Sequence, residues 1–489
     1  MDSSTSSPIP SAPVASPPPA AAPSPPPHVP STDLAKIAGI VRDVRAAYDR
    51  GTTRSVEWRD RQLSALNRML HECEHDIIDA LHEDVGKPHL EAWSAEVAHA
   101  RGGLRSIRKG FRRWMKPERV TTPLIAQPGT SRVVREPLGV VLVIAPWNYP
   151  FELAFTPLAG AIAAGNCVIV KPSEVTPSVS RLLARIVPKY LDPECVRVVE
   201  GGVPETTELL THRFDHIFYT GNGTVARIVM AAAAKHLTPV TLELGGKSPC
   251  IVDARSDLDV AARRIAWAKF YNCGQTCVAP DYVLAHERVY EELIDGLAST
   301  IRDFWGDDPQ TSKDYGRIVN ARHLARLTAL LEGQNVVSGG KSDVADRYLE
   351  PTILRDVSTD SPVMSEEIFG PILPVLKIRD VDEAIHFVNA RPKPLALYVF
   401  TGDSHVSQQV VERTSSGGVV VNHCILHLTV PGLPFGGVGP SGLGAYHGKH
   451  SFETFSHRKS VLSKTTMVDP SLMYPPYTAN KEAWIRRLM

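Results

Sequence analysis

Short, uniformly apolar runs alternate with helical segments through the middle of this chain. The first run, residues 139–144, reads GVVLVI and lacks polar alternation, which predicts a strand buried on both faces of a sheet. The alternation continues with apolar runs at 167–170, 196–199, 216–220 and 240–244 and helical segments at 178–190, 206–210 and 223–235. It predicts parallel strands that right-handed crossovers join into a doubly wound sheet.

A second alternating series runs from about residue 257 to residue 420. The chain has 489 residues, and one hydrophobic core stops growing beyond roughly 250–300 residues. We therefore expect an α/β protein with two doubly wound domains, the first from 32–118 and 138–243 and the second from 244–430. Residues 120–134, rich in Thr, Pro and Gly, predict a projecting hairpin, and we assign 119–137 and 431–489 to a small β-rich element and a C-terminal tail.

The N-terminal 31 residues are dominated by Pro, Ala and Ser and cannot bury enough apolar surface to fold. We expect a flexible tail there. Residues 31–33 (STD) can cap a first helix that ends before Gly51, and a longer helical stretch is expected from about residue 54 to residue 81.

The charge balance limits the possible partners of the protein. With 53 basic and 53 acidic residues, the chain lacks the basic surplus that phosphate backbones require, so we expect no nucleic-acid partner. Seven scattered cysteines without a secretory signal indicate a reducing compartment, and the late first basic residue, Lys36, disfavours organelle import; a cytoplasmic protein is predicted. Pro157 and three further residues interrupt the apolar stretch 153–170, which predicts a buried helix and strand rather than a membrane anchor.

Two residues stand out as chemical candidates. Cys277 closes the run NCGQTC, whose small polar residues suit a turn with inward-pointing N–H groups that could activate a thiol. A buried structural thiol is the alternative, and a metal site with Cys273 lacks its remaining ligands. Glu243 opens the run ELGGKSP at the end of a strand-like segment, where it could serve as a base; an exposed strand-end carboxylate is equally compatible with this motif alone.

Three further patterns imitate ligand sites. The sequence GKS at 246–248 resembles the end of a P-loop, but position 241 is Thr rather than Gly. Residues 221–226 (GNGTVA) fit the loose dinucleotide pattern after a strand, yet no acidic residue follows at the expected distance. Residues 71–75 (HECEH) fit a zinc-protease pattern, but helical phasing places both His residues on the solvated face, so we predict no metal site.

Six motifs resemble the aldehyde dehydrogenase superfamily in order and spacing: PWNYP at 146–150, KPSE at 171–174, ELGGKSP at 243–249, GQTC at 274–277, EEIFGP at 366–371 and PFGGVG at 434–439. The resemblance covers about residues 33–477. His447 and the run SFETFSHR at 451–458 look like the class 3 branch, which acts on fatty and aromatic aldehydes.

The resemblance implies a covalent mechanism for the oxidation of aliphatic or aromatic aldehydes to carboxylic acids. Cys277 would attack the aldehyde, and the Asn148 side chain with the Cys277 N–H would hold the oxyanion of the thiohemiacetal. Hydride would then pass to a nicotinamide, and Glu243 would activate the water that hydrolyses the thioester. A catalytically retired scaffold is the competing hypothesis, which the joint presence of Cys277, Glu243 and Asn148 disfavours.

The resemblance also implies NAD as cofactor, with NADP accepted too, in the domain formed by 32–118 and 138–243. Lys171 and Glu174 would contact the adenosine ribose, and Glu367 and Phe369 the nicotinamide ribose. The remaining implied cofactor contacts are Trp147, Gly221, Asn222, Gly223, Ala226 and Leu244. Two departures concern this region, because the family usually has Gly at the position of Ala226 and lacks Gly223.

For the substrate, the resemblance implies an apolar tunnel beside Tyr149, Phe435 and Asn422, within a catalytic domain at 244–430. His423 has no assignment. The projecting segment at 119–137 and the C-terminal part of the chain at 431–489 resemble oligomerisation elements of the family, so a homodimer is implied.

Overall fold

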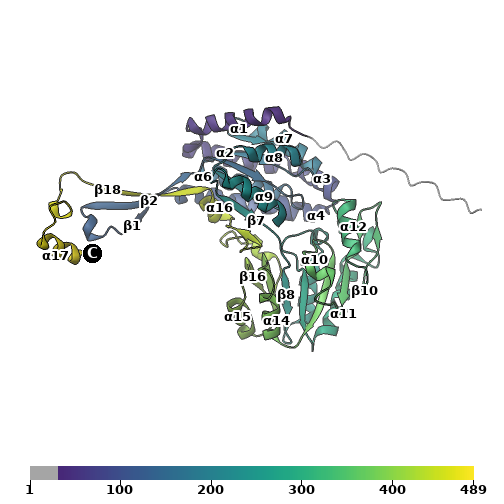
Figure 1. Cartoon of the computed structure of the whole chain (residues 1–489). Helices are drawn as coiled ribbons and strands as arrows, with labels where there is room; N and C mark the ends of the chain where they lie inside the picture. Colours follow the sequence, from purple (N-terminus) through teal and green to yellow (C-terminus); the bar gives the residue numbers. More distant parts are fainter. Residues whose placement is uncertain (1–30, 489) are drawn as a thin grey trace, which may run out of the picture.

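The computed structural model describes residues 31–488, so the expected Pro/Ala/Ser-rich tail lies outside the described residues apart from Ser31. These residues form two α/β lobes, one above the other in Figure 1, and an arm that projects from the first lobe. Each lobe is built around its own sheet. The predicted fold class, two doubly wound α/β units with a small β-rich element, is confirmed.

The first lobe contains a six-stranded sheet with the order β17-β7-β6-β3-β4-β5. Its five parallel strands coincide with the predicted apolar runs: β3 (Val140–Ile144), β4 (Cys167–Lys171), β5 (Val196–Val198), β6 (His216–Thr220) and β7 (Val240–Glu243). Every residue of β3, β4 and β6 is buried, which explains the absence of polar alternation. The crossover helices are α6 (Glu152–Ala164), α7 (Pro177–Tyr190), α8 (Val203–Thr211) and α9 (Gly223–Ala234).

Further helices from the start of the chain complete this lobe. Helix α1 (Leu34–Asp49) begins as predicted, because the Asp33 side chain accepts from Ala35 N–H at 3.0 Å. The single helical stretch expected at 54–81 is instead α2 (Val56–Glu72) and α3 (Glu74–Val85), which separate at Cys73 and let α3 pack on α7. A short α4 (His89–Ala92), a π-helical turn at Trp93–Ala98 and α5 (His99–Trp114) follow.

The second lobe has a seven-stranded sheet with the order β10-β13-β14-β9-β8-β15-β16. Its strands are β8 (Pro249–Val252), β9 (Tyr282–His286), β10 (Asn335–Ser338), β13 (Thr352–Arg355), β14 (Ile372–Ile378), β15 (Ala396–Phe400) and β16 (Gly418–Val421), all parallel except the edge strand β10. The main helices are α10 (Leu258–Phe270), α11 (Tyr290–Trp305), α12 (Ala321–Ala329), α14 (Val381–Asn389) and α15 (Ser404–Arg413).

The arm is a three-stranded antiparallel sheet rather than a simple hairpin. Strand β2 (Gly129–Pro137) pairs with β1 (Glu118–Val120) on one side and with β18 (Ser456–Lys464) on the other. The last helix, α17 (Ala479–Leu488), lies at the tip of the arm (Figure 1). Strand β17 (Gly442–Leu443) and helix α16 (Gly448–Thr454) belong instead to the first lobe, against β7 and α6. Among residues 31–488, no helix is both long and apolar enough to cross a membrane.

Candidate active site

Loops from the two lobes meet near the ends of their parallel strands. The loop after β3 carries Asn148, the segment after α10 carries Cys277, and Glu243 is the last residue of β7. The Asn148 side-chain amide donates to the main-chain oxygen of Gln275 at 3.1 Å, which joins the first two of these segments. Because open α/β sheets bind ligands outside the carboxyl ends of their strands, this junction is the candidate active site.

The loop before Cys277 has a left-handed backbone at three consecutive residues. Asn272, Cys273 and Gly274 have φ angles of 53°, 52° and 70°. A side chain on Gly274 would overlap the main-chain oxygen of Gly370, so only glycine fits there. Strained backbone of this kind persists only where surrounding contacts hold it, which is common at ligand sites.

Gln275 supplies such contacts. Its side-chain oxygen accepts from Val319 N–H at 2.9 Å, and its amide donates to the main-chain oxygen of Arg317 at 2.9 Å. The Gln275 main-chain oxygen accepts from both the Asn148 and the Asn272 side chains at 3.1 Å. One N–H of the Asn148 amide is thus engaged, and its second N–H has no acceptor among residues 31–488.

Cys277 is half-buried, and its environment disfavours the thiolate. Burial raises the pKa of the Cys277 thiol above its usual range, and the carboxylates of Glu367 and Glu243 raise it further. These charges also show that both carboxylates lie within electrostatic range of the sulfur. Cys273 is 1% exposed, and it belongs to no cluster of metal-ligating side chains in the part of the chain that the structure describes.

Glu243 is a carboxylate without partners. It is 3% exposed, and neither of its side-chain oxygens has a hydrogen-bond partner among the described residues. Burial raises the pKa of Glu243 well above its usual range. The alternative of an exposed strand-end carboxylate is therefore wrong. A buried, unpartnered carboxyl is costly to a fold and typical of a reactive site.

The segments expected to hold the adenosine and diphosphate of a dinucleotide lie at the end of β4 and at the start of α9. Lys171 Nζ, at the end of β4, pairs with Glu174 at 2.7 Å. Asn222 caps the exposed start of α9 by accepting from Val225 N–H at 3.0 Å. Ala226 is 2% exposed, so its methyl group packs into the protein.

A second group of predicted cofactor residues lies on the opposite lobe. Burial raises the pKa of Glu367 to about 8, while the N–H of Gly246 lowers it. A side chain at Gly245 would overlap the Glu367 carboxylate. The Trp147 ring contacts the Phe369 ring edge-on, with centroids 5.3 Å apart. Glycine at position 245 lets the main chain come close to a ligand, and the Glu367 carboxyl group and the aromatic rings offer polar and apolar contacts. Both features fit the binding of a nicotinamide riboside. Leu244 is buried and its N–H donates to the main-chain oxygen of Ser441 at 3.1 Å.

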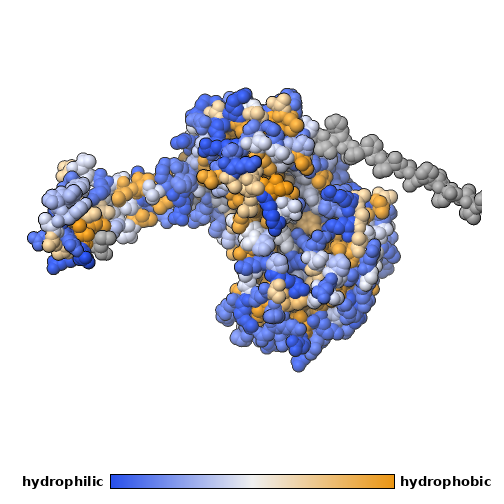
Figure 2. Space-filling view, in the orientation of Figure 1, coloured by the Kyte–Doolittle hydropathy of each residue, from blue (hydrophilic) through white to orange (hydrophobic). Residues whose placement is uncertain are grey.

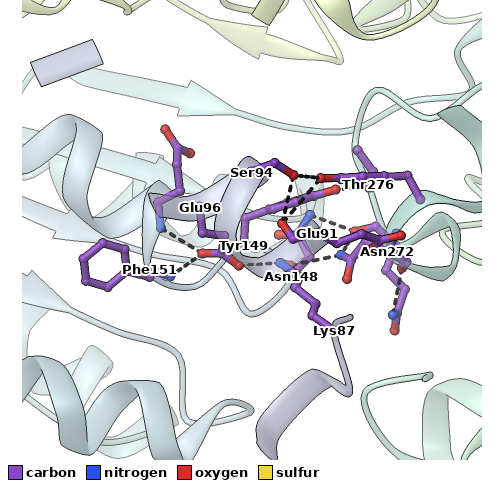
Figure 3. A network of polar contacts seen from close by, with 12 residues as sticks. Lys87, Glu91, Ser94, Glu96, Asn148, Tyr149, Phe151, Asn272 and Thr276 are labelled. Atoms are coloured by element: carbon purple, nitrogen blue, oxygen red, sulfur yellow. Dashed lines mark hydrogen bonds and ion pairs between the residues drawn. The ribbon is translucent and has the colours of Figure 1, made fainter. Parts of the chain in front are cut away.

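Sequence reasoning missed a polar network around Asn148 and Tyr149, drawn in Figure 3. Lys87 and Glu96 form an ion pair with 1% and 0% side-chain exposure. The second oxygen of Glu96 accepts from the N–H groups of Phe151 and Glu152, each at 3.0 Å, at the start of α6. The only sequence signal was two charged residues, Lys87 between α3 and α4 and Glu96 in the π-helical turn, which resemble ordinary surface positions.

The same network reaches the Cys277 loop through Tyr149. Lys87 Nζ lies 3.9 Å from the centroid of the Tyr149 ring, and the Tyr149 hydroxyl bonds the Thr276 hydroxyl at 2.6 Å. Glu91 accepts from the N–H of Asn272 at 2.9 Å. Tyr149 and Thr276 therefore connect the two halves of the site directly beside the thiol.

The other predicted substrate residues differ in their surroundings. Phe435 is buried and stacks on His447, with ring centroids 5.2 Å apart. The Asn422 side chain is occupied by the Thr401 main chain, at 2.8 and 2.9 Å, and so fastens the end of β16. His423 contacts the Trp267 ring edge-on at 5.9 Å.

The structure explains two of the patterns that imitate ligand sites, GKS at 246–248 and HECEH at 71–75. Lys247, in the P-loop-like GKS, pairs with Asp281 and donates to the main-chain oxygens of Val363 and Glu366, each at 2.9 Å. His71 and His75 are exposed, as helical phasing predicted. In the described part of the chain, one group of three His, Cys, Asp or Glu side chains converges closely enough to share an ion: His99, Glu152 and His447.

Comparisons with known proteins agree on one family. The family model for the aldehyde dehydrogenase family matches residues 19–461. The rat protein "Aldehyde dehydrogenase, dimeric NADP-preferring" is 52% identical over 448 residues, which cover 91% of this chain and 99% of the relative. Mouse aldehyde dehydrogenase family 3 member A2 is 51% identical, over 91% of this chain and 92% of its own. The substrate-bound AldH of Staphylococcus aureus superimposes with a TM-score of 0.90 at 47% identity, over 92% of this chain and 99% of that chain.

Proposed function

The chain belongs to the aldehyde dehydrogenase family, and from that premise we propose that it oxidises aliphatic or aromatic aldehydes to carboxylic acids through a covalent thioester on Cys277. The observation that carries the proposal is the convergence of three groups: Cys277, the unpartnered carboxyl of Glu243, and Asn148 with its free amide N–H. A nucleophile, a base and an oxyanion donor are the groups that such a reaction requires.

In the first step, the Cys277 sulfur forms a bond to the aldehyde carbon as its proton leaves. Cys277 is half-buried, so solvent water can take this proton, and Glu243 is kept for the water of the last step. The carbonyl oxygen becomes an oxyanion. The free N–H of Asn148 and the Cys277 N–H would hold it, and such donors each contribute on the order of 3–4 kcal/mol to lowering the barrier.

Bound NAD or NADP would supply the hydride acceptor that converts the thiohemiacetal into a thioester. Lys171, Glu174 and Asn222 would hold the adenosine and diphosphate end. Glu367, Phe369 and Trp147 would hold the nicotinamide end. Their role in this chain is to orient the acceptor towards the carbon bonded to Cys277 and to exclude water during the transfer.

In the last step, a proton passes from water to Glu243 while the water oxygen bonds to the thioester carbon. The Cys277 sulfur then leaves with the bonding electrons, which yields the acid and restores the thiol. The raised pKa of Glu243 makes its ionised form a stronger base than an ordinary carboxylate.

We propose that the cofactor can be either NAD or NADP. Glu174 places a negative charge beside the expected adenosine ribose, which disfavours a 2′-phosphate. Lys171 pairs with this charge at 2.7 Å and reduces its effect. The rat relative is named NADP-preferring.

The arm supports a proposed homodimer. Figure 2 shows hydrophobic residues on the surface of the arm, where Val120, Leu124 and Leu462 are exposed at 45%, 71% and 55%. Apolar surface on a projecting sheet favours association with another copy, and the rat relative is named dimeric. Sedimentation velocity should give the mass of two chains, and Leu462→Asp should shift the protein towards the monomer.

The test of the proposed activity is Cys277→Ala, assayed by the absorbance of the reduced nicotinamide with an aldehyde and either cofactor. We expect the variant to keep the wild-type fold and melting temperature and to lose turnover. Normal turnover in this variant would overturn the mechanism. A wild-type protein that binds NAD or NADP but oxidises no aldehyde would support the retired-scaffold hypothesis instead.

A further inference from the structure

A cavity of about 260 Å³ lies beside the candidate active site, between the start of α5, helix α6 and residues 428–431. Its lining includes Glu152, which follows Asn148 by about one helical turn, and Ser94, whose hydroxyl lies 2.7 Å from that of Tyr271 in the segment that leads to Cys277. His447, also in its wall, stacks on Phe435. The cavity is therefore the space into which the body of an aldehyde bound at Cys277 would extend.

The lining of this cavity combines apolar groups, hydroxyl groups and two imidazoles with a single acidic side chain, Glu152. Ala98, Ile107 and Leu428 supply hydrophobic wall, whereas no Lys or Arg belongs to its lining. Glu152 is 4% exposed. A carboxylate in such surroundings is costly unless donors fill its hydrogen-bonding positions.

The donors around Glu152 are concentrated on one oxygen. Its Oε1 accepts from the Thr156 hydroxyl at 2.7 Å and faces His99 Nδ1 at 3.5 Å. Its Oε2 has no donor among residues 31–488. A carboxylate can accept about four hydrogen bonds, so Oε2 of this cavity-lining group is unfilled.

Neither neighbouring imidazole supplies the missing donor. His99 Nε2 lies 3.0 Å from the main-chain oxygen of Leu428, which can only accept, so this nitrogen carries a hydrogen. The remaining His99 nitrogen faces Oε1 rather than Oε2. Burial lowers the pKa of His447 to about 3, so this ring is neutral at physiological pH and adds no positive charge. Polar atoms of His99, Glu152 and His447 nevertheless lie within 4.8 Å of one another and form one polar spot in the apolar wall.

We propose that this spot is a specificity subsite that selects aldehydes bearing a protonated amino group, which donates to Glu152 Oε2. The inference deepens the proposed function and rests on it. The carbon skeleton of the aldehyde lies against the apolar wall, with the carbonyl at Cys277 and the ammonium group at Glu152. A carboxylate at the same place in the substrate meets the like charge of Glu152, so the subsite disfavours anionic aldehydes.

Rigid aromatic aldehydes that cannot cyclise test the inference: 4-(aminomethyl)benzaldehyde, its neutral analogue 4-methylbenzaldehyde and the anionic 4-formylbenzoate. In the wild-type protein we expect kcat/KM to be at least about tenfold higher for the amino than for the neutral aldehyde, because the ammonium group makes a charge-assisted hydrogen bond to Glu152. Glu152→Gln should reduce this ratio to about one and improve the relative rate with 4-formylbenzoate. The matched control, Glu412→Gln on the exposed face of α15, should keep the wild-type ratio.

Binding without chemistry separates this inference from the proposed function. Titration calorimetry should show that 4-(aminomethyl)benzyl alcohol binds at least about tenfold more tightly than 4-methylbenzyl alcohol, and that Glu152→Gln removes the difference. Oxidation of all three aldehydes without preference, together with equal binding of the two alcohols, would overturn the subsite alone. Loss of all oxidation with the binding difference intact would overturn the proposed function alone. A preference for 4-formylbenzoate that EDTA abolishes would show instead that His99, Glu152 and His447 hold a metal ion.

Discussion

Lys87 and Glu96 form an ion pair that is sealed from solvent beside the loop that carries Asn148 and Tyr149. Glu96 also accepts from two N–H groups at the start of α6, while Lys87 lies over the Tyr149 ring at 3.9 Å. The loop that carries the proposed oxyanion donor is thus fixed at the helix that follows it and at the adjacent aromatic ring. Neither charged side chain touches the expected substrate, so the pair acts through the position of this loop.

Lys87→Met should destabilise the fold by about 3–5 kcal/mol, because it leaves Glu96 as an unpaired buried charge. The double variant Lys87→Met/Glu96→Gln should recover part of this loss, since it removes both charges. Urea denaturation measures the free energy of unfolding, and we expect kcat to fall in both variants with little change in KM for the cofactor. Arg185→Met, which removes an exposed ion pair with Asp76, is the control and should cost at most about 1 kcal/mol.

The strands of the first lobe were predictable because each is buried on both faces and leaves a uniform apolar run, as in β3 and β6. Cys277, Glu243 and Asn148 were predictable as candidates because they lie in motifs whose order and spacing resemble those of the family. Lys87, Glu96 and Glu152 were not. The amino-acid type alone does not tell a buried charged residue from one on the surface. Only the tertiary contacts with α6 and the cavity distinguish the two. Asn422 shows a second limit of the sequence. Its position in the chain suggested a substrate contact, but the sequence did not reveal that its side chain bonds to the main chain of Thr401.

Glu243→Gln should separate the two halves of the reaction. A glutamine cannot take a proton from water, so hydride transfer should continue once on each chain and hydrolysis of the thioester should slow by about 10²–10⁴-fold. Stopped-flow absorbance should show a burst of reduced nicotinamide and then a stalled phase. Steady turnover at the wild-type rate would exclude Glu243 as the base, and Glu208→Gln on α8 serves as a control that should turn over normally.

Acidification should destabilise the fold through its buried histidines. Burial lowers the pKa of His216 and His427 to about 4 and that of His447 to about 3. Below a pH of about 6.5 these histidines bind protons in the unfolded chain but not in the folded chain. Their contribution to the free energy of unfolding is therefore present above this pH and is lost as the pH falls towards 4.

Urea midpoints measured between pH 7.5 and pH 5 should reveal this loss, at up to about 1.4 kcal/mol per pH unit for each histidine. His427 has no hydrogen-bond partner for either ring nitrogen among residues 31–488, so His427→Phe removes one titrating group without breaking a bond. Its stability should depend less steeply on pH than that of the wild type. An unchanged slope would show that His427 does not contribute.

Glu174 should set the balance between the two cofactors. Its carboxylate is paired with Lys171 at 2.7 Å and is 35% exposed, so its repulsion of a 2′-phosphate is reduced by the cation and by solvent but not removed. Glu174→Gln keeps the shape of the side chain and takes away the charge, which also leaves Lys171 free to attract a phosphate. We expect the ratio of kcat/KM for NADP to that for NAD to rise about tenfold, the equivalent of about 1.4 kcal/mol. The rise should shrink at high salt, because screening weakens charges near the surface. Glu194→Gln removes a charge elsewhere on the same lobe, and a similar rise in that variant would show that the net charge of the lobe, rather than Glu174, controls the choice of cofactor.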